Sequence, residues 1–235
     1  MTDLASIKLF ATHPHNCSYL EDKKATTLFV DPELEMSQEL YSNLSELGFR
    51  RSGEHLYRPK CQNCNACIPT RVPAASFSPN RSQRRCLKKN SDIEVKISTS
   101  LNTELYYPLY ERYINTRHSD GDMYPPSIEQ FTSFLVSAWD VTEYAEFWLG
   151  DTLVGVAVMD RLQQDLTAVY TFFDPEHTDR SLGVFAILWQ FQYAQALDLN
   201  SVYLGYWIKD CDKMNYKLKY RPVQLLADRR WVTIS

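Results

Sequence analysis

The sequence predicts an α/β or α+β layer fold for this chain of 235 residues. Two apolar strands, residues 143–149 and 153–159, flank the turn Gly150-Asp151-Thr152, and residues 166–173 read as a third strand. An apolar helix over residues 181–197 and another strand over residues 202–207 come next. Strands followed by a helix and a further strand are typical of a sheet covered by helices.

The first part of the chain predicts shorter elements. Residues 1–35 lack a periodic pattern and are expected to be irregular. Apolar residues recur at helical spacing over residues 36–47, between Ser37 as N-cap and Gly48 as C-cap. Next we expect strands at residues 56–58 and 71–77 around a cysteine loop, a basic helix at 80–90 and a strand at 92–97.

The remaining elements and a change in charge suggest two linked units. Helices are predicted over residues 101–118 and 128–139, and a lysine-rich helix and a strand near residues 224–227 close the chain. Residues 1–90 carry 13 basic and 9 acidic residues, whereas residues 91–200 carry 5 and 17. We therefore predict a small N-terminal α+β portion over residues 1–98 and a second domain over residues 99–235.

A dense basic block lies in residues 50–90, with ten Lys and Arg against the single acid Glu54. Such a block either neutralises nucleic-acid phosphates or forms a solvated face. We expect the basic helix to contact a tRNA backbone through five side chains: Arg81, Arg84, Arg85, Lys88 and Lys89. The sequence shows no signal peptide and no long apolar run, which predicts a cytoplasmic protein that does not enter a membrane.

The run Cys61-x2-Cys64-x2-Cys67 is the strongest metal-site pattern in the sequence. A tight loop with this spacing can present three thiolates to one ion of a zinc or iron–sulfur site. Cys17 is the predicted fourth ligand, and His13, His15 and His55 are the alternatives. The alternative is a loop of buried, inert cysteines. No P-loop, G-x-G-x-x-G, G-x-S-x-G or H-E-x-x-H motif occurs, which argues against the corresponding nucleotide and hydrolase sites.

Residues 179–185 resemble the turn at which acetyltransferase folds bind the pyrophosphate of coenzyme A. Arg180 and Gly183 fit that pattern, but Phe185 replaces its second small residue. The resemblance implies an acetyltransferase-like (GNAT-type) second domain that has lost the acetyl donor. Acetyl transfer from acetyl-CoA stays open as an alternative activity.

Several motifs together resemble the aminoacyl-tRNA–protein transferases. They are Tyr57-Arg58-Pro59-x-Cys61-x2-Cys64-x-Ala66-Cys67-x-Pro69-x-Arg71, His15-x-Cys17-x-Tyr19-Leu20, Gly48-Phe49-Arg50-Arg51-Ser52-Gly53, Ser82-Gln83-Arg84-Arg85 and Tyr203-Leu204-Gly205-Tyr206-Trp207-Ile208-x2-Cys211-x-Lys213-Met214-x-Tyr216-Lys217. The resemblance spans about residues 10–225 and is strongest to the bacterial enzymes that add leucine to N-terminal Asp or Glu. It implies Leu-tRNA and proteins beginning with Asp or Glu as partners, in N-end rule degradation. There are two alternatives: arginyl transfer from Arg-tRNA to the same acceptors, and a metal-dependent RNA-binding module without catalysis.

The implied reaction needs no cofactor, because the aminoacyl ester is already activated. Arg58 and Arg71 are predicted to bind the acidic side chain of the acceptor, since arginine pairs with carboxylates in a bidentate way. Tyr206, Tyr216 and Lys217 are predicted to hold the charged end of the tRNA. We expect Asp174, after the third strand, to orient the attacking amine.

Overall fold

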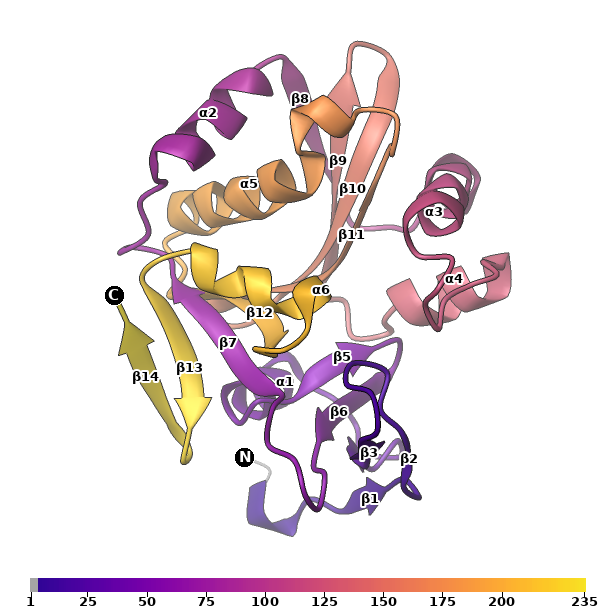
Figure 1. The fold of residues 1–235 in the computed structure, drawn as a ribbon, viewed down its shortest axis with the longest axis vertical. Helices are drawn as coiled ribbons and strands as arrows, with labels where there is room; N and C mark the ends of the chain where they lie inside the picture. Colours follow the sequence, from indigo (N-terminus) through magenta and orange to yellow (C-terminus); the bar gives the residue numbers. More distant parts are fainter. Residues whose placement is uncertain (1–3) are drawn as a thin grey trace.

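A large and a small β-sheet organise the protein in the computed structural model, which describes residues 4–235 (Figure 1). The small sheet has the order β1-β4-β6-β5, and β2 and β3 form a separate hairpin. These strands are β1 (Leu9–Ala11), β2 (His15–Asn16), β3 (Lys24–Ala25), β4 (Thr27–Val30), β5 (Arg50–Ser52) and β6 (His55–Pro59). The prediction of an irregular segment is therefore wrong over residues 9–30, and its residues 1–3 lie outside the described part of the chain. Its strands are short and largely exposed, so they leave no alternating pattern in the sequence.

The large sheet confirms the predicted mixed α/β architecture. Its order is β14-β13-β7-β12-β11-β10-β9-β8, and among the pairings of the described strands only β11 with β12 is parallel. The strands are β7 (Ile68–Pro73), β8 (Ile93–Ser98), β9 (Thr142–Leu149), β10 (Thr152–Arg161), β11 (Asp165–Phe173), β12 (Ser201–Trp207), β13 (Val223–Ala227) and β14 (Arg230–Ile234). Strands from both ends of the chain thus meet in one sheet.

Helices cover both faces of the large sheet (Figure 1). One face packs against α5 (Leu182–Ala196), which in turn contacts α2 (Arg81–Lys89). The other face packs against α3 (Thr103–Arg117), beside α4 (Ile128–Leu135). Between these layers β10 is buried along nearly its whole length, which explains its continuous apolar sequence. The remaining helices are α1 (Gln38–Glu46), α6 (Asp212–Asn215), η1 (Leu4–Ser6), η2 (Thr178–Arg180) and η3 (Tyr216–Lys219).

Local capping explains where the helices begin. The Ser37 side chain accepts the backbone N–H of Leu40 at the start of α1, and Gly48, with φ of 87°, lies beyond its end. Asn80 forms a capping box with Gln83 at the start of α2. These predicted boundaries are confirmed.

Two predicted elements end earlier than expected. Helix α4 ends at Leu135 rather than at residue 139, and its carbonyl there lies 3.5 Å from Nη2 of Arg51. The strand predicted at residues 71–77 lies instead at Ile68–Pro73, because the chain turns at Ala74, whose N–H bonds the carbonyl of Asn200. Both differences come from partners distant in sequence.

A buried ion pair joins the two sheets. Arg51 on β5 reaches Asp160 on β10 through Nε···Oδ2 at 2.6 Å and Nη2···Oδ1 at 2.8 Å, and both side chains are 0% exposed. Tyr41 and Thr142 donate their hydroxyls to the same carboxylate at 2.7 and 2.8 Å. The lone pairs of Asp160 are therefore well satisfied, as a buried charge requires.

Candidate functional site

A gap opens between two central strands at the middle of the large sheet. In the described chain β11 pairs with β12 only over Asp165–Thr167, although both strands continue. Arg50 on β5 caps the start of this gap, because its guanidinium donates to Thr167 Oγ1 and to the carbonyl of Ala168. Gly205 on β12 has φ of 82°, and a Cβ there would lie 3.6 Å from Nε of Arg50. Glycine is favoured at this position because it can adopt the left-handed backbone conformation beside the Arg50 guanidinium.

Lys217 lies buried close to this arginine. Its residue is 3% exposed, and its Nζ is 3.4 Å from Sδ of Met214 and 4.9 Å from the centre of the Tyr216 ring. Burial, and then the charge of Arg50, lower the pKa of Lys217 to about 7. An amine with such a pKa can hold or release a proton at neutral pH.

Tyr206, also predicted as a site residue, is tied to the N-terminal portion of the chain. Its hydroxyl donates to the carbonyl of Gly48 at 2.9 Å and lies 3.2 Å from the carbonyl of Tyr57. Burial raises the pKa of Tyr206 well above its ordinary value. These contacts make Tyr206 a link between β12 and the small sheet, and a direct role in the reaction stays a prediction.

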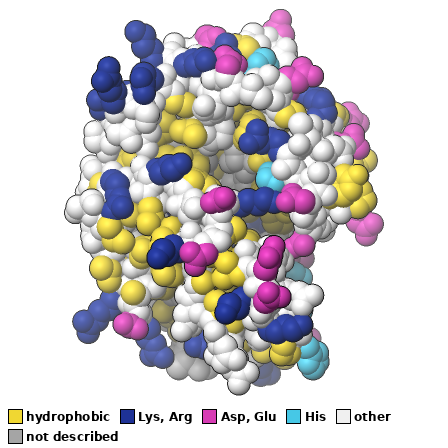
Figure 2. All heavy atoms as spheres, viewed as in Figure 1, with side chains coloured by type: hydrophobic (Ala, Val, Ile, Leu, Met, Phe, Trp, Pro, Cys, Tyr) yellow, Lys and Arg dark blue, Asp and Glu magenta, His cyan; other side chains and the backbone are white. Residues whose placement is uncertain are grey.

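A second group of charges lies at the end of β11. Asp174 follows this strand, and its Oδ1 accepts the N–H of Glu176 at 3.0 Å while its Oδ2 lies 3.2 Å from Nη2 of Arg112 on α3. The guanidinium of Arg117, at the end of the same helix, lies 5.4 Å from the centre of the Phe173 ring. Figure 2 shows the surface hollowed above α6, between α5 and α3.

Arg58 and Arg71 both contact other groups of the protein. Arg58 donates to the carbonyl of Leu47 at 2.8 Å and lies over the Phe49 ring. Arg71 donates to Gln224, to Glu46 and to the Tyr203 hydroxyl, and its side chain is 16% exposed. The Arg71 guanidinium is thus engaged within the fold, whereas Arg58 makes a single hydrogen bond, and the acceptor-binding role of both stays a prediction.

The basic face of α2 is open to solvent. Arg81, Arg84, Arg85, Lys88 and Lys89 are all exposed, and dark-blue side chains gather over this helix at the upper left of Figure 2. Only Lys89 is paired with an acid among the described residues, at 2.9 Å from Oδ2 of Asp179. The predicted tRNA contact stays a prediction on a surface that is free to make it.

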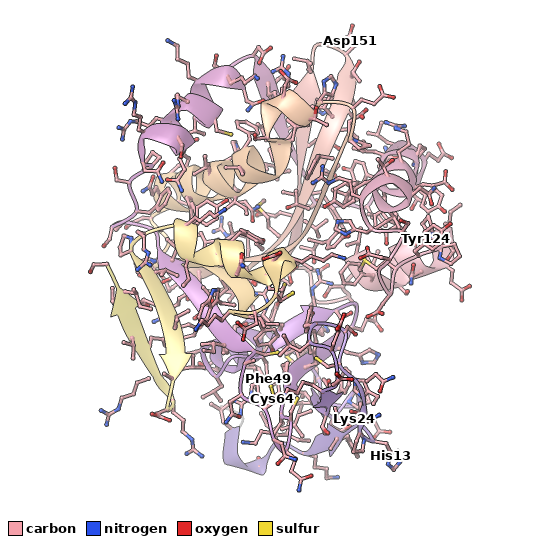
Figure 3. All side chains as sticks on the ribbon, viewed as in Figure 1. His13, Lys24, Phe49, Cys64, Tyr124 and Asp151 are labelled. Atoms are coloured by element: carbon pink, nitrogen blue, oxygen red, sulfur yellow. The ribbon has the colours of Figure 1, made fainter. Side chains whose placement is uncertain are left out.

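The predicted metal site does not fit the geometry of the cysteines. Among residues 4–235 no three Cys, His, Asp or Glu side chains are grouped in a way that could hold a metal. The Cys61 thiol lies 3.9 Å from the carbonyl of Thr26, and Figure 3 shows Cys64 in the lower part of the molecule. Burial and the neighbouring thiols, Cys17 first among them, raise the pKa of Cys67 to about 12. The six cysteines are free thiols of intermediate burial, so the structure supports neither a closed metal site nor a loop of buried, inert cysteines.

The turn that resembles a coenzyme A site is filled by the protein itself. Arg180 pairs with both carboxylate oxygens of Asp92, at 2.8 and 2.9 Å. Gly183 packs against Phe173, since a Cβ there would lie 3.0 Å from the ring, and Phe185 is buried in the core. The small residue at this turn therefore serves packing, which argues against the acetyl-transfer alternative.

Comparison with known proteins agrees with the motifs. The family model for "Arginine-tRNA-protein transferase, C terminus" matches residues 105–227, and the model for the N terminus matches residues 15–85. This chain belongs to the arginine-tRNA–protein transferase family. Proteins named aspartate/glutamate leucyltransferase from Pseudomonas putida and Pseudomonas fluorescens are 58% and 55% identical to it, over 100% of both chains. A solved domain of a putative lysylphosphatidylglycerol synthetase from Agrobacterium fabrum covers 94% of this chain and 81% of that chain at 12% identity. Its TM-score of 0.49 is too low to assign a fold.

Three arginines close to Lys217 and Asp174 were not predicted from the sequence as site residues. Arg50 lies in the motif Gly48-Phe49-Arg50-Arg51. Nothing in that motif indicates that Arg50, rather than Arg51, bonds to β11. Arg112 and Arg117 are two of only five basic residues in the acidic segment 91–200. That scarcity is the one signal that could have singled them out.

Proposed function

We propose that this protein transfers leucine from Leu-tRNA to the N-terminal α-amine of proteins that begin with Asp or Glu. The observation that carries this proposal is identity of 55–58% over the full length to proteins named aspartate/glutamate leucyltransferase. The product would enter N-end rule degradation in the cytoplasm. The family models match residues 15–85 and 105–227, in line with a first unit over residues 1–98 and an acetyltransferase-like second domain over residues 99–235, although β7 and β8 of the first unit join the large sheet.

The transfer itself is a simple substitution at an activated ester. The neutral α-amine forms a bond to the leucyl carbonyl carbon, the bond from that carbon to the ribose oxygen breaks, and the amine proton passes to that oxygen. An α-amine has an ordinary pKa of about 7.7–8.0, so part of it is neutral near pH 7. Positioning and proton transfer are therefore the main tasks of the protein, and no cofactor is needed.

Two groups suit these tasks. Asp174, held by the N–H of Glu176, has a second oxygen that can accept from the attacking amine. Lys217, whose pKa is lowered to about 7, can exchange a proton with the ribose oxygen as it departs. Tyr216, whose ring lies under the Lys217 ammonium, is proposed to contact the terminal nucleotide of the charged tRNA. The exposed face of α2 would contact the tRNA backbone.

Mass spectrometry of acceptor peptides tests this function directly. Peptides beginning with Asp, Glu, Lys or Ala would be incubated with the protein and with bulk tRNA charged with leucine or with arginine. We expect the mass of leucine to appear on the Asp and Glu peptides alone. Addition of arginine would keep the family and change the donor, which is the second candidate because of the family model's own description. No addition from intact charged tRNA would overturn the proposal.

A further inference from the structure

The acceptor of the proposed reaction carries two opposite charges on its first residue. A protein that begins with Asp or Glu has an α-ammonium and, a few bonds away, a side-chain carboxylate. A site that selects such residues needs a cation for the carboxylate beside an acceptor for the amine. The predicted cations are Arg58, which has one hydrogen bond to the Leu47 carbonyl, and Arg71, whose guanidinium is already engaged by Gln224, Glu46 and Tyr203.

The end of β11 holds a pair of charges with the required complementarity. Asp174 and Arg112 touch through a single contact, Oδ2 to Nη2 at 3.2 Å, and the Arg112 side chain is 50% exposed. Within the described part of the chain, the other N–H groups of Arg112 have no hydrogen-bond acceptor. Arg117 is exposed and has no ion-pair partner among the described residues, and its guanidinium lies 5.4 Å from the centre of the half-buried Phe173 ring. Both arginines can therefore accept a new carboxylate without losing an existing network.

The surroundings hold these arginines in place. Phe173 is fixed by Tyr113, whose ring centre is 4.9 Å away, and by Gly183 at the start of α5. The Tyr113 hydroxyl in turn lies 3.0 Å from Nε2 of His118. Burial, and then the charges of Lys213 and Arg117, lower the pKa of His118.

We infer that Arg112 and Arg117 bind the side-chain carboxylate of the acceptor's first residue, while Asp174 receives its α-amine. This inference rests on the proposed function. On binding, the weak contact between Arg112 and Asp174 is exchanged for two charge-assisted contacts to the acceptor. An acceptor that begins with a neutral residue leaves Arg112 and Arg117 desolvated without an anion, so it is disfavoured.

A tRNA phosphate is the competing occupant of the two arginines. The surrounding charge argues for a single small carboxylate, because Asp174 lies against Arg112 and Asp120 is 2.7 Å from Lys213 on the same side of the molecule. These carboxylates belong to a segment with 17 acidic and 5 basic residues, which repels a polyanion.

Steady-state kinetics with matched acceptors tests the inference. Peptides that differ only in a first residue of Asp or Asn are compared in the wild type, Arg112→Gln, Arg112→Lys and Arg117→Gln. Lys96→Gln is the control, because Lys96 also has an acidic neighbour, Glu94 at 3.6 Å, and lies over an aromatic ring, that of Trp148. We expect each Gln variant to lower kcat/KM for the Asp peptide by about 10- to 100-fold, with a change below about threefold for the Asn peptide.

The controls separate the outcomes. The KM for Leu-tRNA and the melting temperature should stay unchanged in all variants. Arg112→Lys should keep part of the preference for Asp, because lysine keeps the positive charge but cannot form the bidentate hydrogen bonds of arginine. No leucine transfer by the wild type would overturn the proposed function together with this inference. Wild-type transfer with an unchanged ratio of Asp to Asn in both Gln variants would overturn the inference alone. A raised KM for Leu-tRNA would assign the arginines to the tRNA instead.

Discussion

The protein contains two arginine–aspartate pairs of the same chemistry but of different burial and hydrogen bonding. Arg51 and Asp160 are 0% exposed, and their contacts of 2.6 and 2.8 Å are completed by hydroxyls of Tyr41 and Thr142. Arg112 and Asp174 are 50% and 11% exposed and share one contact of 3.2 Å. The first pair has no capacity left for a ligand, whereas the second has both spare donors and spare acceptors. Geometry and burial, not residue type, separate a structural pair from a binding pair.

Breaking the buried pair should have the largest effect on stability. Asp160→Asn leaves the Arg51 charge buried without a counterion, which costs about 3–5 kcal/mol. For a chain of this size we expect the melting temperature to fall by roughly 10 °C, measured by circular dichroism. Leucine transfer at low temperature should persist in the folded fraction. A melting temperature within about 2 °C of the wild type would contradict this interpretation.

Replacing the aspartate of the Arg112–Asp174 pair by asparagine should affect activity much more than stability. Asp174→Asn weakens a single contact to Arg112, whose side chain is 50% exposed and can be solvated instead, so the melting temperature should fall far less than for Asp160→Asn. The amine loses its charged acceptor, and we expect kcat/KM for the Asp peptide to fall about 100-fold. Equal activity of Asp174→Asn and the wild type would remove Asp174 from the proposed site.

Lys217 extends the comparison to a buried charge with no carboxylate partner among its described contacts. Its pKa falls from an ordinary 10.5 to about 7 in the folded chain. Between these values the unfolded chain binds more protons, so the free energy of unfolding rises with pH over this window, by up to a few kcal/mol. Urea titrations from pH 6.5 to 10 should show this rise in the wild type and lose it in Lys217→Met. Parallel pH curves for both proteins would show that Lys217 is charged when folded.

Substituting the exposed basic residues of α2 should have the smallest effect on the stability of the protein. Arg84→Glu with Arg85→Glu should leave the melting temperature within about 2 °C, because neither side chain has an acidic partner among the described residues. Binding to all tRNAs should weaken alike, by about tenfold or more at 0.1 M salt, with a shallower salt dependence. Filter binding over a range of salt measures both. Unchanged affinity at low salt would exclude this helix from the interface.

Much of the fold follows from local patterns. The hairpin of β9 and β10, helix α5 and the caps at Ser37 and Asn80 lie where periodicity and capping predict them. The short strands β1 to β5 and the final strand β14 were missed. They are too short or too exposed to leave an alternating pattern, and they form only because a neighbouring strand offers a free edge.

The sequence by itself determined the mixed α/β class, the exposed basic helix and, through ordered motifs, the family. Only the tertiary structure decided which charges are free. Arg71 and Arg112 are both arginines of ordinary sequence context, yet one is enclosed by Glu46, Gln224 and Tyr203 and the other faces solvent beside Asp174. The physical reason is that binding capacity depends on burial and on unsatisfied hydrogen-bonding groups, and both arise from residues that meet only when the sheets assemble.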